Sequence, residues 1–260
     1  MGLLSASAIF PIYMMASNSF RSNIQYAASR IGLPSTLSFG AIRRAWTGAS
    51  IPTYFRNSLV ISICTVALSI LLATMAGYSF SKLRWRLSRA VYLFLLVWIV
   101  VPPVILLVPL YAEMVQLRMY NTYWSVVLIY TALNLPFNVY LMTAYFRSLP
   151  DELVDAARVD GAGVHAVFFR VLVPIARPAL ATLVIFNFLW VWNEFLYALL
   201  LLPSNSTKTL TVGVLQLQGR FNLDPTALMA GLLIATLPVI GVFLVFQRHL
   251  VRAIAAGLGR

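Results

Sequence analysis

The sequence predicts an all-α, polytopic membrane protein with about six transmembrane helices, and two observations support this fold class. First, 61% of the 260 residues are hydrophobic and only 10% are charged, whereas about 25% of the residues of a soluble domain are charged. Second, the apolar residues occur in blocks close to the roughly 20 residues that a helix needs to cross a bilayer. Most of the surface is therefore expected to face lipid, in a single membrane domain over residues 1–260.

Apolar blocks separated by polar stretches give the expected order of the elements. The predicted spans are residues 3–16, 54–80, 90–111, 122–146, 179–202 and 228–246. The third block contains Pro102, Pro103 and Pro109, so its helix is expected to be kinked, with neighbouring helices satisfying the backbone groups that the prolines free. Residues 17–53 and 203–227 are polar and are expected to be loops.

The basic residues lie between the apolar blocks, where they meet anionic headgroups and set topology. The formal net charge of +12 is therefore not taken as a sign of nucleic-acid binding. Residues 81–89, residues 147–178 and the tail after residue 246 together hold eleven Lys and Arg, against eight in the rest of the chain. This bias predicts that those three segments face the cytoplasm.

Residues 147–178 form the most charged connection between the later spans, with eight charged side chains. Pro150, followed by Asp151 and Glu152, is a favourable helix start, because proline gives up no needed donor and carboxylates suit the positive end of the helix dipole. The glycines at 161 and 163 predict a break after about three helical turns. The sequence therefore predicts a short helix, a turn and a second short helix, able to dock in a partner's groove.

The same segment resembles the EAA loop of permease subunits of binding-protein-dependent ABC importers. That family's pattern is Glu-Ala-Ala, three residues, Gly, nine residues and then Ile-x-Leu-Pro. Here Asp-Ala-Ala at residues 155–157, Gly161 and Val-Leu-Val-Pro at residues 171–174 keep the whole spacing. The substitutions are conservative, and the acid is retained one methylene shorter.

The resemblance extends over nearly the whole chain and points to the carbohydrate-uptake group, which includes the maltose and glycerol-phosphate permeases. Its other supporting residues are Asn57-Ser58, Leu149-Pro150, the Trp-Asn-Glu-Phe run at residues 192–195, and Leu237-Pro238. In that family the loop forms a cytoplasmic coupling helix that sits in a cleft of an ATPase. The residues that the resemblance assigns to ATPase coupling are Pro150, Glu152, Asp155, Ala156, Ala157, Gly161 and Pro174.

The resemblance also implies the partners: a cytoplasmic ATPase dimer, a second homologous permease, an extracytoplasmic solute-binding protein near residues 203–227, and membrane lipid. The chain has no Gly-x-x-x-x-Gly-Lys-Ser/Thr phosphate loop, so ATP and Mg are expected on the ATPase and no cofactor on this chain. No catalytic set or metal-ligand cluster is apparent, so an enzyme is not expected. The predicted protein is a multi-pass importer subunit for a sugar or sugar-like solute in the bacterial cytoplasmic membrane.

Glu194 is the one acid deep in an apolar block, and an intramembrane acid is a functional candidate by default. If the fifth span is one helix, Asn187, Trp190 and Glu194 share a face. Such a polar and aromatic stripe suits a sugar path, but asparagine and glutamate also bond between helices. Both interpretations stay open for the translocation candidates, which are Asn134, Asn138, Asn187, Trp190, Asn193 and Glu194.

Two other functions were weighed against an ATP-driven importer. An ATP-independent secondary transporter or channel would be expected to show paired ionisable groups or inverted repeats across several spans, and the chain has one such acid and no apparent repeat. A passive membrane anchor would leave Asn187, Asn193 and Glu194 unexplained.

Overall fold

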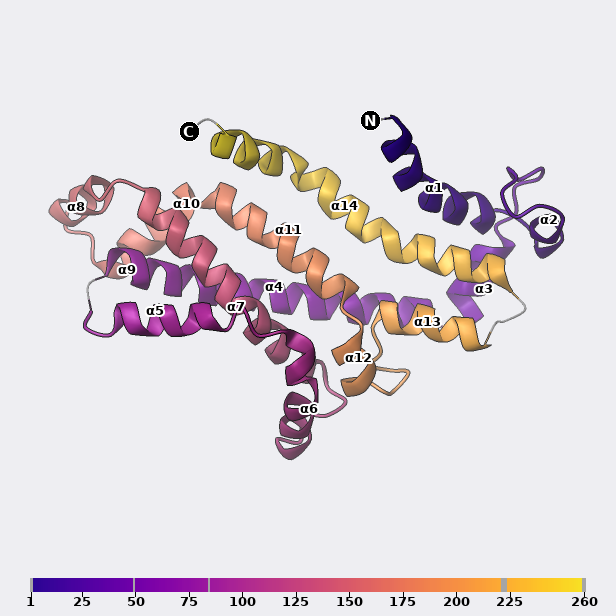
Figure 1. Cartoon of the computed structure of the whole chain (residues 1–260), viewed down its shortest axis with the longest axis horizontal. Helices are drawn as coiled ribbons and strands as arrows, with labels where there is room; N and C mark the ends of the chain where they lie inside the picture. Colours follow the sequence, from indigo (N-terminus) through magenta and orange to yellow (C-terminus); the bar gives the residue numbers. More distant parts are fainter. Residues whose placement is uncertain (1, 49, 84, 221–223, 259–260) are drawn as a thin grey trace. The chain divides into compact units, whose positions relative to one another are not determined.

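The computed structural model describes the backbone of residues 2–48, 50–83, 85–220 and 224–258. Within these ranges it describes the side chains of residue 7 and of residues 9–48, 50–83, 85–215 and 224–247. The described part contains helices and turns and no β-strand, which confirms the all-α class (Figure 1). Arg84 and Arg260 lie outside the described residues, and Arg248 and Arg252 lie outside the described side chains.

Contacts between chain segments divide the molecule into two compact units, which are described one at a time. Unit 1 comprises Met1–Val60, Tyr120–Tyr123 and Trp192–Val242, and unit 2 comprises Ile61–Met119, Trp124–Val191 and Phe243–Arg260. The organisation as a single membrane domain stays a prediction.

Unit 1 contains helices in both stretches that were expected to be loops. Its elements are α1 (Gly2–Ser19), α2 (Asn23–Ala28), α3 (Gly40–Gly48), the start of α4 (Ile51–Lys82), α12 (Leu196–Leu201), α13 (Leu210–Arg220) and most of α14 (Pro225–Leu258). In α3 the buried side chains are Ala41 and Ala45, one turn apart. A stripe of small residues within a polar segment was enough to form a helix face, which a reading based on overall polarity missed.

Trp192 organises the interior of unit 1. Its indole nitrogen donates to the Ala235 carbonyl at 3.0 Å, and the Thr211 hydroxyl donates to its own carbonyl at 2.9 Å. Its ring packs edge-on against Phe55, with centroids 5.7 Å apart. One aromatic residue therefore joins α4, α13 and α14 in this unit.

Unit 2 holds the remaining helices. They are the rest of α4, α5 (Ser88–Val97), the 3-10 turn η1 (Pro103–Leu106), α6 (Leu107–Gln116), α7 (Tyr123–Ser148), α8 (Glu152–Val159), α9 (Val164–Ala166), the π-helical segment η2 (Val167–Leu172), α10 (Val173–Ile175) and α11 (Arg177–Asn193). A buried cluster that includes Tyr78, Met142, Phe146 and Val154 forms the core. A Cβ added to Gly77 would lie 2.7 Å from the Met142 Cβ, so α4 and α7 pack closely through a small residue, as transmembrane helices do.

Several helices have the length and composition of membrane spans, which confirms a polytopic protein. Among the described residues these are α4, α7 and the Pro225–Gln247 part of α14. A bent pair, Val164–Ile175 followed by Arg177–Asn193 at 74°, meets the same criteria when taken together. The expected kink in the third block is a full break, because residues 98–102 are not helical and η1 begins only at Pro103.

The fifth expected span is not one helix, so the prediction of a continuous helix over residues 179–202 is wrong. Helix α11 ends at Asn193, Glu194 and Phe195 are non-helical, and α12 begins at Leu196. The Glu194 carboxylate accepts the amides of Tyr197 at 3.0 Å and Ala198 at 3.2 Å. It therefore satisfies the first amides of α12, as a capping side chain does, and favours a new helix start at this point.

Candidate functional site

The connection between α7 and α9, residues 150–163, is called the hook here. Helix α8 begins after Pro150, and its first turn carries Glu152 and Asp155. The Asp151 carbonyl accepts the amides of Val154 at 2.9 Å and Asp155 at 3.0 Å. The carboxylates therefore lie at the positive end of the helix dipole, and the predicted helix start is confirmed.

Gly161 ends α8 with a backbone conformation that suits glycine. Its φ is +81°, its amide donates to the Arg158 carbonyl at 3.0 Å, and the next amide, from Ala162, donates to the Ala157 carbonyl at 2.9 Å. These two bonds form a Schellman motif, which closes a helix through the backbone alone. The predicted break is confirmed, and nothing lies within 4 Å of where a Cβ would stand on Gly161, so the constraint there is on φ.

The two faces of α8 differ in exposure. Val154 is 3% exposed and belongs to the buried core of unit 2, against which Ala157 and Ala162 also pack. One exposed stripe of α8, its outer face, carries Glu152, Asp155, Ala156 and Val159, and Leu153 and Arg158 are exposed beside it. Arg158 lies 3.5 Å from Asp155. Val159 is 87% exposed. The hook therefore presents two carboxylates and an apolar tip on a helix that is packed on its other side.

Two side chains of α4 hold the hook at its two ends. At the start, Lys82 donates from Nζ to the Leu149 carbonyl at 2.7 Å and pairs with Asp151 Oδ1 at 2.5 Å. At the far end, the Tyr78 hydroxyl donates to the Val164 carbonyl at 3.4 Å, and the Tyr78 ring lies 5.4 Å from that of Phe168. Figure 1 shows α8 and α9 beside the end of α4.

Sequence reasoning missed both anchors. From the sequence, Lys82 belongs to the basic cluster that sets topology, and Tyr78 belongs to the span over residues 54–80. A lysine at the end of a span has the same sequence signal in both roles, and only its burial distinguishes them: its side chain is 4% exposed, against 79% for Asp151.

Pro174 lies beyond the hook, where the chain returns to the membrane. It is part of α10, directly after the π-helical segment η2 and before the 74° bend into α11. Its side chain is half-buried. Pro174 therefore belongs to the connection between hook and span, and it is not part of the exposed face of α8.

The structure pairs two of the translocation candidates with each other. Asn138 on α7 and Asn187 on α11 exchange side-chain hydrogen bonds of 2.8 and 3.0 Å, and both are 1% exposed. Asn187 also donates to the Leu183 carbonyl at 2.8 Å. Such amide pairs stabilise helix packing in membranes by about 0.6–2 kcal/mol. This geometry favours the alternative of a bond between helices for these two residues.

The other candidates lie apart from that pair. In unit 2, the Asn134 amide donates to the Tyr130 carbonyl of its own helix at 2.8 Å, and the Trp190 ring packs edge-on against Tyr130 at 5.5 Å. Asn193 and Glu194 belong to unit 1, where Asn193 is exposed and Glu194 caps α12. The continuous stripe through Asn187, Trp190 and Glu194 is not formed, because the helix ends before Glu194. A pathway role for any of the six stays a prediction.

Unit 1 contains a densely bonded loop, residues 203–209, called the anchored loop here. Asn57, which is fully buried, donates to the carbonyls of Ser206 and Lys208, each at 2.9 Å, and accepts from the Tyr123 hydroxyl at 2.6 Å. The neighbouring Ser58 hydroxyl accepts the Leu210 amide at 2.8 Å. The Asn-Ser pair that opens the second predicted span therefore fixes the start of α13.

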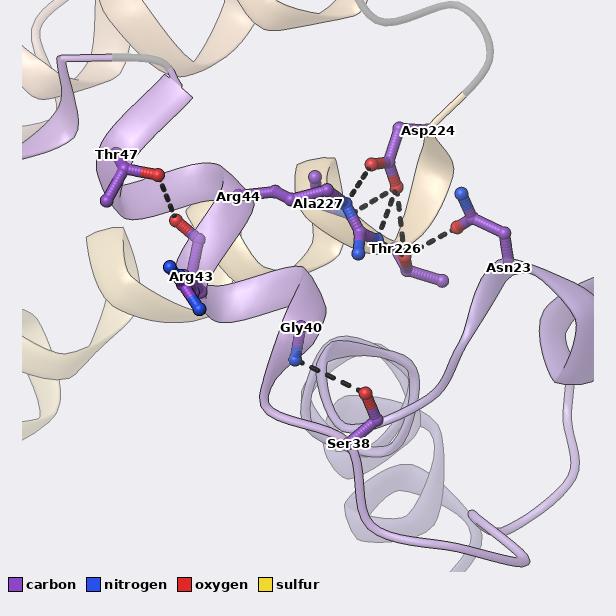
Figure 2. A network of polar contacts seen from close by, with 9 residues as sticks. All are labelled: Asn23, Ser38, Gly40, Arg43, Arg44, Thr47, Asp224, Thr226 and Ala227. Carbon is purple, nitrogen blue, oxygen red and sulfur yellow. Dashed lines mark hydrogen bonds and ion pairs between the residues drawn. The ribbon is translucent and has the colours of Figure 1, made fainter.

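A second polar network in unit 1 joins α3 to the start of α14 (Figure 2). Arg44 bonds Asp224 through Nε at 2.5 Å and through Nη2 at 3.2 Å. The Asp224 carboxylate also accepts the Ala227 amide at 3.0 Å, so it caps α14. The Thr226 hydroxyl accepts from Arg44 at 3.0 Å and lies within bonding distance of Asp224 and Asn23.

The electrostatics of this network depend on the Asp224 carboxyl. Burial alone would raise the pKa of Asp224, but the hydrogen bonds from Arg44, the Ala227 amide and Thr226, together with the charge of Arg44, lower that pKa below its usual value. The carboxylate is therefore the stable form at neutral pH.

Comparison with known protein families gives a match over most of the chain. Residues 66–256 match the family model described as the inner membrane component of binding-protein-dependent transport systems.

Individual relatives agree with that match. The chain is 33% identical over 260 residues to the diacetylchitobiose uptake system permease protein NgcG of Streptomyces coelicolor, covering 99% of this chain and 86% of that protein. It is 30% identical over 256 residues to the melibiose/raffinose/stachyose import permease protein MelC of Bacillus subtilis, covering 98% and 92%. Among solved structures, a bacterial ABC transporter involved in importing the acidic polysaccharide alginate has a chain with the same fold. The TM-score is 0.85 at 24% identity, covering 95% of this chain and 92% of that chain.

Proposed function

The chain belongs to the family of inner membrane components of binding-protein-dependent transport systems, and from that premise we propose that it imports a sugar or sugar-like solute as the permease subunit of an ATP-driven ABC transporter. It is a multi-pass protein of the bacterial inner membrane, and it is a transport subunit and not an enzyme. The relatives NgcG and MelC are permeases for diacetylchitobiose and for melibiose, raffinose and stachyose, which supports an oligosaccharide as the solute.

The observation that carries the coupling proposal is the exposed face of the hook. Glu152, Asp155, Ala156 and Val159 project from a helix whose other face is packed into the core. An apolar tip flanked by carboxylates suits a groove with an apolar floor and basic rims. We place this face in a cleft of a cytoplasmic ATPase dimer, which binds and hydrolyses ATP with Mg while this chain binds neither.

The anchors of the hook explain how a displacement there would reach the membrane. Lys82 and Tyr78 fasten both ends of the hook to α4, and Val154 packs with Met142 and Phe146 of α7. Packed cores deform little, so a push on α8 moves the ends of both helices with it. Such rigid-body motion is a common form of switching between conformations.

Other partners follow from the family. A second homologous permease would complete the translocation path, and an extracytoplasmic solute-binding protein would deliver the solute near residues 203–227. Because Asn193 is exposed whereas Asn138 and Asn187 are each 1% exposed, Asn193 is the better candidate for contact with solute in this conformation.

The test is ATP-driven solute uptake by the complete importer in proteoliposomes, with Gly161→Ala and Gly163→Ala compared. Neither residue has an atom within 4 Å of a new Cβ, but φ is +81° at Gly161 and −71° at Gly163. Alanine at positive φ costs about 1–2 kcal/mol, a factor of about 5–30 in a local equilibrium. Uptake is expected to fall at least fivefold in Gly161→Ala and to stay near wild type in Gly163→Ala.

Two outcomes would contradict the proposal. Equal ATP-driven uptake by both glycine variants would remove the hook from the coupling path. Uptake driven by an ion gradient in vesicles that lack the ATPase would favour a secondary transporter or channel.

A further inference from the structure

A pocket in unit 2 lies outside everything that the proposed function uses. It has a volume of about 750 Å³ and forms around the start of α5, between the end of α4 and Arg147 near the end of α7. Aromatic side chains form much of its wall, with Phe80 lying 5.7 Å from Trp85 and 5.5 Å from Tyr92 between ring centroids. None of the residues assigned to coupling or translocation lines it.

The pocket is strongly cationic. Arg86, Arg89 and Arg147 line it, and none of the other described residues that line it carries a carboxylate. Among the described residues, no ion pair involves any of these three arginines. The Arg147 guanidinium is held over the Tyr92 ring, 5.0 Å from its centroid, a cation–π contact that orients the group without neutralising it.

The N-terminus of α5 adds to this positive potential. Leu87 at the N-cap provides no side-chain hydrogen bond, and the first turn contains no acidic residue. An uncapped helix start attracts anions through its amides and dipole. Three uncompensated guanidinium groups and a helix N-terminus together fit an anion such as a phosphate.

The surface beside the pocket is apolar, and this distinguishes between sources of phosphate. Arg89, Leu93 and Val97 follow one another at four-residue spacing, so they lie along one face of α5. Leu93 is 50% exposed and Val97 is 64% exposed. Trp85, which also lines the pocket, is 40% exposed, and tryptophan is enriched where headgroups meet hydrocarbon. A ligand that fits the whole feature has an anionic head and a long apolar tail.

We propose that this pocket binds the headgroup phosphate of an anionic phospholipid, with an acyl chain lying along Leu93 and Val97. Basic pockets between transmembrane helices bind such headgroups in other membrane proteins. The three arginines contact the phosphate, and the exposed face of α5 contacts the chain. A free phosphate ion would use the arginines and leave the apolar face unused.

The test measures lipid binding to the purified complete importer in mild detergent, with fluorescent phosphatidylglycerol, phosphatidylcholine and inorganic phosphate as probes. Phosphatidylglycerol is expected to bind more tightly than phosphatidylcholine. Each Arg→Gln change at 86, 89 and 147 is expected to weaken phosphatidylglycerol about fivefold, the effect of one basic residue near an anionic surface. The matched control is Arg177→Gln, an exposed arginine outside the pocket, and it should bind like wild type.

A variant with glutamine at all three positions should lose the preference for phosphatidylglycerol. A second variant keeps the test decisive if this triple glutamine variant fails to assemble. Replacing the same three residues by lysine keeps the charge, so selectivity for phosphatidylglycerol should persist and weaken with added salt. Equal binding of the two lipids, or unchanged phosphatidylglycerol binding in the glutamine variant, would overturn the site. Inorganic phosphate that binds as tightly as phosphatidylglycerol and displaces it would overturn the lipid assignment.

Discussion

The hook and the anchored loop are both short connections at helix ends, but they use their polar residues in opposite ways. In the hook the carboxylates of Glu152 and Asp155 are exposed, and the helix is held by backbone bonds and a buried valine. In the anchored loop the polar side chains bind the chain itself. For example, Asn121 donates to the Ser204 hydroxyl at 2.7 Å and accepts from that of Thr207 at 2.6 Å.

This difference is the one expected between a docking surface, such as the hook, and a structural element, such as the anchored loop. Polar groups that are satisfied within the chain make a loop rigid and leave little for a partner to bind. Charged groups that stay exposed on a rigid helix can still bond to a partner. Because the helix is already ordered, little conformational entropy is lost when the partner binds. The comparison therefore predicts that changes in the anchored loop reduce stability, whereas changes on the outer face of the hook reduce coupling.

The largest effect on stability is expected from Asn57→Ala. It removes the donor to two carbonyls and the acceptor of the Tyr123 hydroxyl at a fully buried position. Each buried group left unsatisfied costs about 1–3 kcal/mol, so the free energy of unfolding should fall by about 3 kcal/mol or more. Thermal unfolding of the purified importer should show a midpoint several degrees lower, at roughly 2–4 °C per kcal/mol.

Asp155→Asn is the counterpart from the hook. Its side chain is 68% exposed and lies 3.5 Å from Arg158, so the unfolding midpoint should stay near wild type while ATP-driven uptake falls. If Asn57→Ala were harmless to stability, or if Asp155→Asn lowered the midpoint as much, the contrast between the two regions would be wrong.

A smaller effect is expected from Lys82→Met, which sharpens the comparison within the hook. Methionine keeps the buried stem but leaves the Leu149 carbonyl without its donor, at a cost of about 1–3 kcal/mol. Amide hydrogen exchange over residues 149–160 should become faster, and coupled uptake should fall. Asp151→Asn is the control, because Asp151 is 79% exposed and the bond from Lys82 to the Leu149 carbonyl remains. If Asp151→Asn impaired exchange and uptake as much as Lys82→Met, the ion pair, and not the bond to Leu149, would hold the hook.

The smallest effect is expected from Asp224→Asn, and it depends on pH. Because the pKa of Asp224 is lowered in the folded protein, the carboxylate stabilises the fold fully above its unfolded pKa of about 3.9, and this contribution is lost as the pH falls through the lower folded value. Arg44 is 44% exposed, so the contribution is discounted for solvent to about 1 kcal/mol.

Unfolding midpoints at pH 7, 5 and 3.5 test this prediction. The difference between wild type and Asp224→Asn should be present at pH 7 and 5 and should shrink at pH 3.5. Arg43→Gln, an exposed neighbour on α3, should follow wild type throughout. A difference that grows as the pH falls would contradict the assigned direction of the pKa.

Features that depend on local chemistry were predictable from the sequence. Pro150 and the acids after it marked the start of α8, and Gly161 marked its end, because a helix start and a positive φ each need particular residue types. The apolar blocks predicted the membrane class, because the length of an apolar run can be read directly from the sequence.

Features that lack a distinctive local signal, or that depend on residues far apart in the chain, were not predictable. Nothing in an apolar run signals that Glu194 will end one helix by capping the next, since glutamate is common inside helices. The hydrogen bond between Asn138 and Asn187 joins residues 49 positions apart on two helices, and no local pattern indicates it. The burial of Lys82 depends on packing between α4 and the start of the hook, which no sequence window contains.

The backbone closure of the hook at Gly161 has a consequence for substitutions on its outer face. The Schellman bonds and Val154 hold α8 in place, so the exposed side chains of its outer face contribute little to holding it against the core. If the hook docks on an ATPase as proposed above, substitutions at Glu152, Asp155, Ala156 or Val159 would change its fit to that partner while the helix itself persists.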